Sequence, residues 1–333
     1  MQALFCACRI TAVSAPRCIR LNEAPVSQLA RVRPTRVYRF YRGGALIQRL
    51  RGLPERDDDQ PEDWVGSVVA ADNPGRDEPE AGLTRLEDGR LLREAIEQDR
   101  AHWGTPDLLV KLLDPVERLP VHAHPDREFA RANLGSEYGK TEAWVVIATR
   151  EAEAEVWLGL KESTDHKRYR EWIEEQATDD LLDSLHRLAV RTGDVVFVPA
   201  GVPHAIGPGV LMVELQEPTD FSIICEWKGF PIQPADAHLG LGWDRAIEAL
   251  HLDAFEPKLG LPDAARPFFH VDDRAEPAGQ FGVLLVLEGE GEIDGERVRA
   301  GDAFVLPAGA APFSVRGDLR VLRCLGPQNG GTT

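Results

Sequence analysis

The sequence predicts a mainly β protein made of two β-barrel modules with added helical segments. Three observations predict this class: a strand–turn motif that occurs twice, β-rich stretches ahead of each copy, and helical spacing confined to short segments. The chain has 333 residues, which is enough to bury a large core and favours two domains.

The repeated motif reads Gly-Asp-Val-Val-Phe-Val-Pro-Ala-Gly at residues 193–201 and Gly-Asp-Ala-Phe-Val-Leu-Pro-Ala-Gly at residues 301–309, an offset of 108 residues. Gly-Asp predicts a tight turn, the apolar run predicts a short strand, and Pro-x-Gly predicts its end. β-rich stretches precede the two copies, at residues 143–148 and 154–158 for the first and at residues 283–287 and 291–295 for the second. We therefore expect two related modules.

Helical spacing of apolar residues occurs in three segments, at residues 91–98, 162–189 and 235–253. We expect these helices to cover open faces of the barrels, and we assign no chemistry to them. With them, residues 37–234 form the first module and residues 235–333 form the second.

Residues 1–36 differ from the rest of the chain in their charges. They hold six arginines, no lysine and a single acid, Glu23. An Arg-rich, acid-poor stretch is typical of an organelle-targeting segment or of a disordered arm. We expect these residues to form an extension outside the fold.

The overall composition excludes several classes of partner. A net charge of −17 repels phosphates, so we expect neither nucleic acid nor an anionic membrane as a partner. No stretch of the chain approaches the roughly 18 apolar residues of a membrane span. Five cysteines without a paired framework favour a reducing compartment, so we expect a cytoplasmic protein, as a monomer or a homodimer.

Four side chains are candidates for one metal site. His122 and His124 form a His-x-His pair, and residues two apart on a strand point to the same face. Glu142 and His204, on other strands, would complete a site of three nitrogens and one oxygen. A lone His-x-His also occurs on ordinary surfaces, but the second copy of the repeat has Pro312 in place of His204 and lacks a His-x-His pair. That asymmetry favours a real site in the first module.

The motifs together resemble the class I mannose-6-phosphate isomerases of the short bacterial type, within the cupin (jelly-roll) superfamily. Five pieces match in order, in addition to the opening strand at residues 41–44: residues 62–67, 108–114, 121–126, 139–144 and 199–207. The resemblance implies two cupin modules and a metal-dependent aldose–ketose isomerase acting on a sugar or sugar phosphate. Zinc is the expected divalent metal, with manganese or iron as alternatives. His122 stands where the family has a glutamine, and the other three ligands carry over as His124, Glu142 and His204.

Two positions depart from the family pattern. Pro120 stands where the family usually has a serine in the region that helps to hold the phosphate, and Ile224 falls where the family has an active-site arginine. An isoleucine cannot pair with a phosphate. The sugar, and whether it carries a phosphate, therefore stay open.

Isomerisation through an enediol needs a base and a group that stabilises the developing oxyanion. Lys140 precedes Glu142 by two residues and shares its face of the strand. Glu217 and Asp220 are the acid/base candidates, and the sequence does not choose between them. The candidate substrate-binding residues are Trp64, Ser67 and Lys111.

Two other functions remain compatible with these residues. One is a cupin metalloenzyme of different chemistry, such as an oxygenase or an epimerase with iron or manganese. The other is a non-catalytic sugar-sensing protein that binds a metal without turnover.

Overall fold

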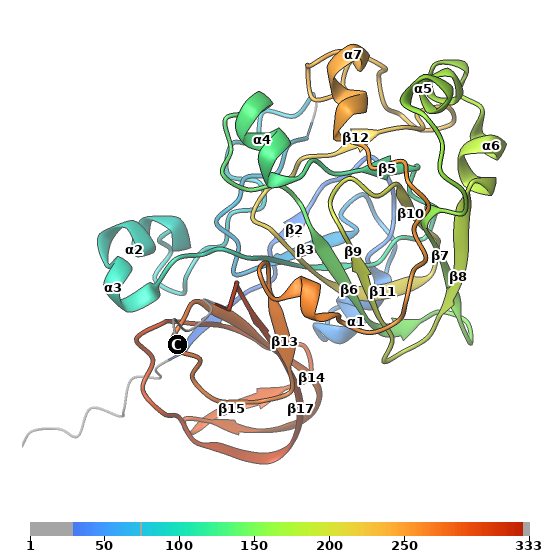
Figure 1. The fold of residues 1–333 in the computed structure, drawn as a ribbon. Coiled ribbons are helices and arrows are strands. Elements are labelled where there is room, and N and C mark those ends of the chain that lie inside the picture. Colours follow the sequence, from blue (N-terminus) through green and yellow to red (C-terminus); the bar gives the residue numbers. More distant parts are fainter. Residues whose placement is uncertain (1–28, 74, 329–333) are drawn as a thin grey trace, which may run out of the picture.

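Three antiparallel sheets build most of the part of the chain that the computed structural model describes, residues 29–73 and 75–328 (Figure 1). The central sheet has the order β2-β3-β4-β11-β6-β9, with bounds Arg36–Val37, Glu62–Val65, Leu109–Leu113, Val210–Gln216, Glu142–Thr149 and Val195–Val198. The histidine sheet has the order β12-β5-β10-β7-β8, with bounds Ile223–Ile224, His122–Ala123, His204–Ile206, Ala154–Leu160 and Leu185–Val190. The C-terminal sheet has the order β1-β16-β14-β17-β13, with β15 on β14 and bounds Ala30–Val32, Ala303–Leu306, Gly282–Ile293, Val315–Leu325, His270–Asp272 and Glu296–Arg299. The mainly β prediction is confirmed.

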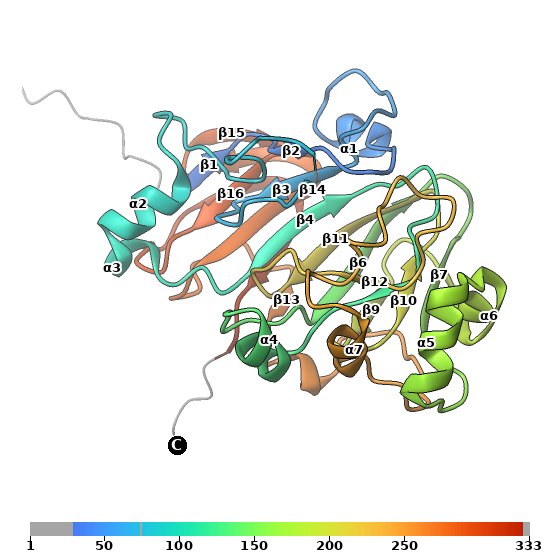
Figure 2. The ribbon, with the colours of Figure 1, turned by 90° about the horizontal axis from the view of Figure 1, so that it is seen from above.

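The central sheet is buried on both faces, because alternate residues of each strand point to opposite sides. Val65 and Val213 point to one side and share a hydrophobic core with Val283 and Val305 of the C-terminal sheet. A Cβ at Gly66 would lie only 2.8 Å from Cγ2 of Val305, so the two sheets approach closely there. The opposite side faces the histidine sheet, and a second hydrophobic core lies between these two sheets (Figure 2).

The two copies of the repeat occupy equivalent places in their sheets. Gly193 and Gly301 open their turns with positive φ, 100° and 90°, which glycine adopts without strain. In the first copy Val198 pairs with Glu142, and in the second Leu306 pairs with Gly282. Gly282 therefore stands in the second copy where Glu142 stands in the first. Closure of the C-terminal sheet into a second barrel stays a prediction.

The N-terminal boundary predicted from the sequence is wrong for residues 29–36. Residues 30–32 form β1, which pairs with β16 of the C-terminal sheet. Arg31 forms an ion pair with Asp302 at 2.9 Å, and Val32 is buried. Backbone pairing and a single buried valine carry little signal in an Arg-rich stretch, so the sequence did not reveal this strand. The rest of the predicted extension lies outside the described residues, together with Cys6, Cys8 and Cys18.

The helices are short, with bounds Ala45–Leu50 (α1), Leu92–Gln98 (α2), Arg100–Trp103 (α3), Arg127–Asn133 (α4), His166–Glu175 (α5), Thr178–Asp183 (α6) and Trp243–Ala246 (α7), and 3-10 turns at Ile247–Ala249 (η1) and Asp263–Ala265 (η2). Helix α2 confirms the predicted segment 91–98. The prediction over residues 162–189 is wrong at its end, because residues 185–190 pair with β7 as strand β8. Helices α5, α6 and α7 lie along the histidine sheet, on the side away from the C-terminal sheet (Figure 1).

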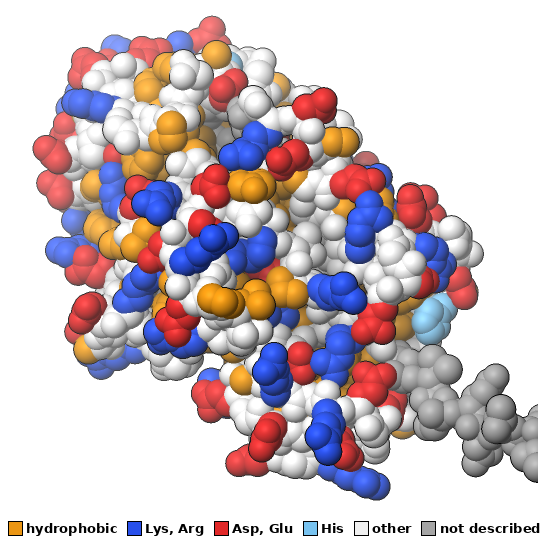
Figure 3. Space-filling model, turned by 180° about the vertical axis from the view of Figure 1, so that it is seen from behind, with side chains coloured by type: hydrophobic (Ala, Val, Ile, Leu, Met, Phe, Trp, Pro, Cys, Tyr) orange, Lys and Arg blue, Asp and Glu red, His pale blue; other side chains and the backbone are white. Residues whose placement is uncertain are grey.

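The molecular surface carries charges of both signs side by side. On the face drawn in Figure 3, lysine and arginine side chains alternate with aspartate and glutamate, and single hydrophobic side chains lie between them. Among the described residues, no helix has the length and apolar character needed to cross a membrane.

Removing β1 should destabilise the protein. A chain that starts at residue 33 loses the β1–β16 pairing and the buried side chains of Leu29 and Val32, and it keeps β2 of the central sheet. We expect a loss of about 3 kcal/mol or more in the free energy of unfolding, because burying each large apolar side chain contributes about 1.5–3 kcal/mol. Urea unfolding of this chain beside one that starts at residue 29 measures the difference. Equal midpoints would show that β1 adds nothing to stability.

Candidate metal centre and its cavity

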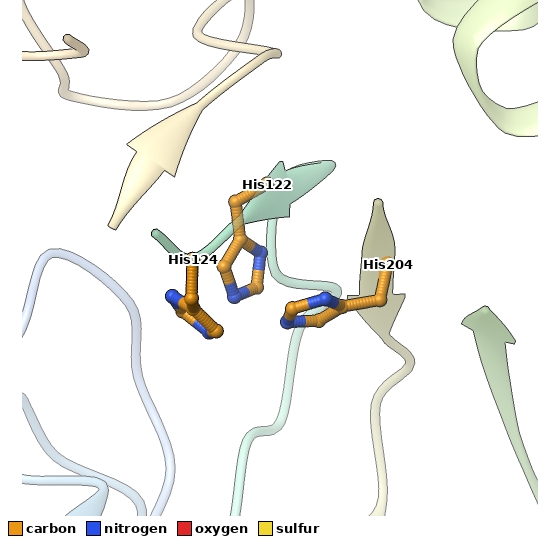
Figure 4. Close-up of side chains that lie close together, drawn as sticks. All are labelled: His122, His124 and His204. Atoms are coloured by element: carbon orange, nitrogen blue, oxygen red, sulfur yellow. The ribbon is translucent and has the colours of Figure 1, made fainter. Parts of the chain in front are cut away.

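Three imidazoles meet between neighbouring strands of the histidine sheet. Strands β5 and β10 are antiparallel and place His122 directly opposite His204. His124 follows His122 by two residues, so its ring turns to the same side (Figure 4). All three side chains are buried, and one nitrogen of each lies within 4.8 Å of the corresponding nitrogens of the other two.

The second nitrogen of each ring is held by the backbone. Nδ1 of His122, His124 and His204 lies 2.9, 2.8 and 2.9 Å from the carbonyl oxygens of Pro120, Phe221 and Val202. A carbonyl can only accept, so each Nδ1 carries the proton and each Nε2 presents a lone pair, which in His124 lies 3.0 Å from Nζ of Lys140. Nε2 of His204 is buried and has no hydrogen-bond partner. Metal-binding histidines are oriented in this way, so the residues present fit a metal ion.

Glu142 approaches the imidazoles from the central sheet, where it begins β6. Its Oε2 lies 3.3 Å from Nε2 of His124, and its Oε1 lies 3.4 Å from Nε2 of His204. The indole nitrogen of Trp144 donates to Oε1 at 3.0 Å, and Nζ of Lys140 lies 3.1 Å from Oε2. The carboxylate is thereby fixed beside two of the three histidines.

Burial sets the protonation of these groups. It lowers the pKa of His122 well below its usual value, lowers the pKa of His124 to about 3 and also lowers the pKa of His204. The imidazoles are therefore neutral at neutral pH, which is the form that binds metal. Burial raises the pKa of Glu142, but the charge of the Lys140 ammonium outweighs it, and the net pKa lies well below the usual range. The site thus combines neutral nitrogen donors with an ionised carboxylate.

A cavity of about 370 Å³ opens beside His122 and Glu142. Lys111, Lys140 and Asp220, which the sequence analysis names as catalytic or substrate-binding candidates, line it. Both positions that depart from the family pattern, Pro120 and Ile224, also line it. Ile224 pairs directly with His122 across β12 and β5, so its side chain faces the same side as the imidazole.

The sequence analysis missed Glu214, which lies in the same cavity. It stands on β11 opposite Lys111, and its Oε1 lies 3.6 Å from Nζ of Lys111 and 3.8 Å from Nζ of Lys140. This oxygen is buried and accepts no hydrogen bond. Burial, together with the charge of Glu142, raises the pKa of Glu214 to about 7. A single acid inside the apolar run 210–215 was the available signal.

The sequence analysis also missed a group around Arg39 at the other side of the cavity. Nη2 of Arg39 donates to Asp220 at 2.8 Å, and its Nε donates to Glu62 at 3.0 Å. The hydroxyl of Tyr41 donates to Glu62 as well. Burial raises the pKa of Asp220, but the charge of Arg39 outweighs it and keeps the net pKa well below the usual range. Asp220 is therefore held as an ion-pair partner.

Three of the predicted catalytic and substrate-binding residues do not reach the cavity lining. Glu217 follows the end of β11 and points away, where it accepts hydrogen bonds from Nε of Arg127 at 2.5 Å and from the backbone N–H of Thr141 at 2.9 Å. It is already paired, so it is poorly placed for proton transfer.

The other two, Ser67 and Trp64, are packed inside the protein. The hydroxyl of Ser67 donates to the carbonyl of Val69. Trp64 is fully buried, and Nζ of Lys111 lies 4.6 Å from the centre of its ring. The indole nitrogen of Trp64 donates to Glu62 at 2.7 Å. Both therefore support residues around the cavity without lining it.

Comparison with known proteins gives one consistent result. The mannose-6-phosphate isomerase ManA of Bacillus subtilis is 30% identical over 257 residues, which cover 69% of this chain and 79% of that protein. The mannose-6-phosphate isomerase of Streptococcus mutans is 28% identical over 239 residues, or 65% of this chain and 72% of that protein. No protein-family model matches the chain.

Solved structures show the same fold. The mannose 6-phosphate isomerase of Bacillus subtilis superposes with a TM-score of 0.69 at 24% identity, over 90% of this chain and 99% of that one. A putative mannosephosphate isomerase of Archaeoglobus fulgidus has a TM-score of 0.69 at 20% identity, over 92% of this chain and 100% of that one.

Proposed function

Because the chain belongs to the mannose-6-phosphate isomerase family, we propose that it is a metal-dependent aldose–ketose isomerase. It interconverts mannose 6-phosphate and fructose 6-phosphate, or the matching pair of a related sugar, through an enediol. The observation that carries the proposal is the convergence of three neutral imidazoles and one carboxylate, of which His122 and Glu142 line a sugar-sized cavity.

His122, His124 and His204 would hold the metal, with Glu142 as the fourth ligand. Three nitrogens and one oxygen suit zinc, and also manganese or iron. When bound, such an ion acts as a Lewis acid on the substrate oxygens and stabilises the negative charge of the enediolate.

The proton transfer is assigned to Glu214. The aldose becomes the ketose when the proton on C2 is removed and a proton is returned to C1. A carboxylate with a free oxygen in the cavity and a pKa near neutrality is suited to both steps. Asp220, the sequence-based candidate, would instead hold Arg39 and Lys111 in place.

Lys140 would bind the oxygen atoms on the reacting carbons C1 and C2. Its Nζ lies beside Glu142 and 3.0 Å from Nε2 of His124, so it borders the place where the C1 and C2 oxygens would sit. An ammonium there can stabilise the enediolate oxygen and carry the hydroxyl proton from O2 to O1. Lys111, on the far side of Glu214, would orient the remaining hydroxyl groups.

The proposal is tested with metal-loaded protein and with the same protein after chelation. Mannose 6-phosphate and free mannose are supplied separately in D₂O, and NMR follows ketose formation and deuterium uptake at C1 and C2. We expect conversion only with metal, together with solvent deuterium at the reacting carbons. Absence of any conversion of these two sugars and of a panel of other aldoses, by protein that holds one metal per chain, would refute the proposal.

A further inference from the structure

Every cation that lines the cavity already has a carboxylate partner. Lys111 and Lys140 lie within 4.0 Å of Glu214 and of further acids, and Arg39 is held by Glu62 and Asp220. A phosphate entering the inner cavity would have to compete for these pairs, and breaking a buried pair leaves an uncompensated charge.

Arg76 is the fourth cation of the lining and lies at its exposed rim. It faces Asp59 at 3.4 Å and Glu78 at 3.7 Å, and its guanidinium stacks over the ring of Tyr38 at 3.9 Å. Its side chain is 42% exposed, so water screens any pair that it makes. Among the described cations of the lining, Arg76 is therefore the most accessible to an anionic group, and its role is tested by a separate variant.

Acids outnumber bases in the lining. In the part of the lining that the structure describes, six carboxyl groups face four lysine and arginine side chains: Glu62, Asp72, Glu142, Glu214, Asp220 and Asp236 against Arg39, Arg76, Lys111 and Lys140. With all six carboxyl groups ionised, a divalent metal would bring this set to neutrality. A phosphate dianion would then add two uncompensated negative charges, and the net charge of −17 of the whole chain repels it further.

Part of the lining is apolar, beside polar side chains such as Ser222, Asn73 and Tyr38. Leu119, Pro120, Ile206, Ile224 and Ile232 form this apolar wall, and Ile224 stands opposite His122 in the strand register. These side chains donate no hydrogen bonds, so phosphate oxygens placed there would lose their water without replacement. A hydroxymethyl or methyl group loses little in the same place.

From this distribution we infer that the preferred substrate is an uncharged aldose, with Ile224 as the residue that sets the preference against a phosphate. The inference rests on the proposed isomerase function and specifies its substrate class. The hydroxyl groups of a neutral sugar can donate to the lining carboxylates, which supply acceptors that a phosphate cannot use.

The first test compares kcat/KM of the metal-loaded full chain for D-mannose and for D-mannose 6-phosphate. We expect the free sugar to be favoured by at least about 10-fold, since a site without a partner for a charged group rejects that group strongly. A preference for the phosphate ester would overturn the inference and leave the isomerase function standing. If neither sugar nor a panel of other neutral aldoses is isomerised, the function itself fails.

The second test places a cation at the apolar wall. Ile224→Arg should raise kcat/KM for mannose 6-phosphate relative to mannose by about 10-fold or more, because the guanidinium can form two parallel bonds to a phosphate. Ile224→Gln is the matched control, of similar length but uncharged, and should not shift the ratio. An equal shift in both variants would overturn the role given to Ile224.

A third variant, Arg76→Gln, checks the rim. If the wild-type protein prefers the phosphate ester and this variant loses that preference, the rim arginine binds phosphate and the inference is wrong. If the ratio of the two kcat/KM values stays the same, the inner cavity sets the preference, as inferred.

Discussion

Replacing His204 with alanine is expected to remove the metal and abolish isomerase activity. His204 is fully buried, its Nε2 has no hydrogen-bond partner among the described residues, and its Nδ1 is fixed by the carbonyl of Val202. Loss of a residue that only orients a ligand weakens metal binding by about 10–100-fold, so loss of a ligand itself should cost at least 100-fold. Metal content after dialysis, measured by mass spectrometry, and the NMR assay give the two readouts.

His251→Ala is the control for this variant. Its side chain is 55% exposed and lies near Asp126, away from the cavity lining, so it removes an imidazole without touching the proposed ligands. We expect full metal content and activity from it. A His204→Ala protein that keeps one metal per chain would show that the ligand set is misassigned.

The second large effect is expected from Glu214→Gln, which should lower kcat by about 10²–10⁴-fold, the range typical of a lost general base. The amide has nearly the same shape, so metal content and KM should change little. Burial and the charge of Glu142 raise the pKa of Glu214 to about 7, so the carboxyl loses its base form as the pH falls. The wild-type rate should therefore fall on the acidic side, and the variant should lack that dependence.

Glu217→Gln is the matched control, because it changes the same type of residue three positions along the chain. Glu217 is held by Arg127 and the Thr141 N–H outside the cavity lining, so the variant should lose stability more than kcat. Deuterium exchange at C2, followed by NMR, separates lost proton transfer from lost binding. A larger loss of exchange in Glu217→Gln than in Glu214→Gln would reverse the assignment.

The histidines could be located from the sequence because their positions follow from strand geometry alone. His122 and His124 share a face by the two-residue period, and the 108-residue offset of the repeat places Pro312 in the second copy where His204 stands in the first. Lys140 follows from the same parity with Glu142.

The acid/base residue could not be chosen because the choice depends on where β11 ends. Glu214, Glu217 and Asp220 are close in sequence, but only the register with β4 places Glu214 opposite Lys111. Strand β11 ends at Gln216, and beyond it the two-residue period no longer predicts the direction of a side chain. The pairing of β1 with β16 was likewise hidden, since it joins segments about 270 residues apart and rests mainly on backbone hydrogen bonds.

One face of the central sheet carries the residues proposed to act on the substrate, and its other face packs against the C-terminal sheet. Lys111 and Glu214 alternate along their strands with Leu112 and Val213, whose side chains belong to the core shared with the C-terminal sheet. Arg51 ties the two parts together as well, because it bonds to Asp63 and to the carbonyl of Gly301. The second copy of the repeat lacks the proposed ligands, but its removal or replacement would disturb the packing of the strands that carry Lys111 and Glu214. Selection on activity extends in this way to valines and leucines that no substrate ever touches.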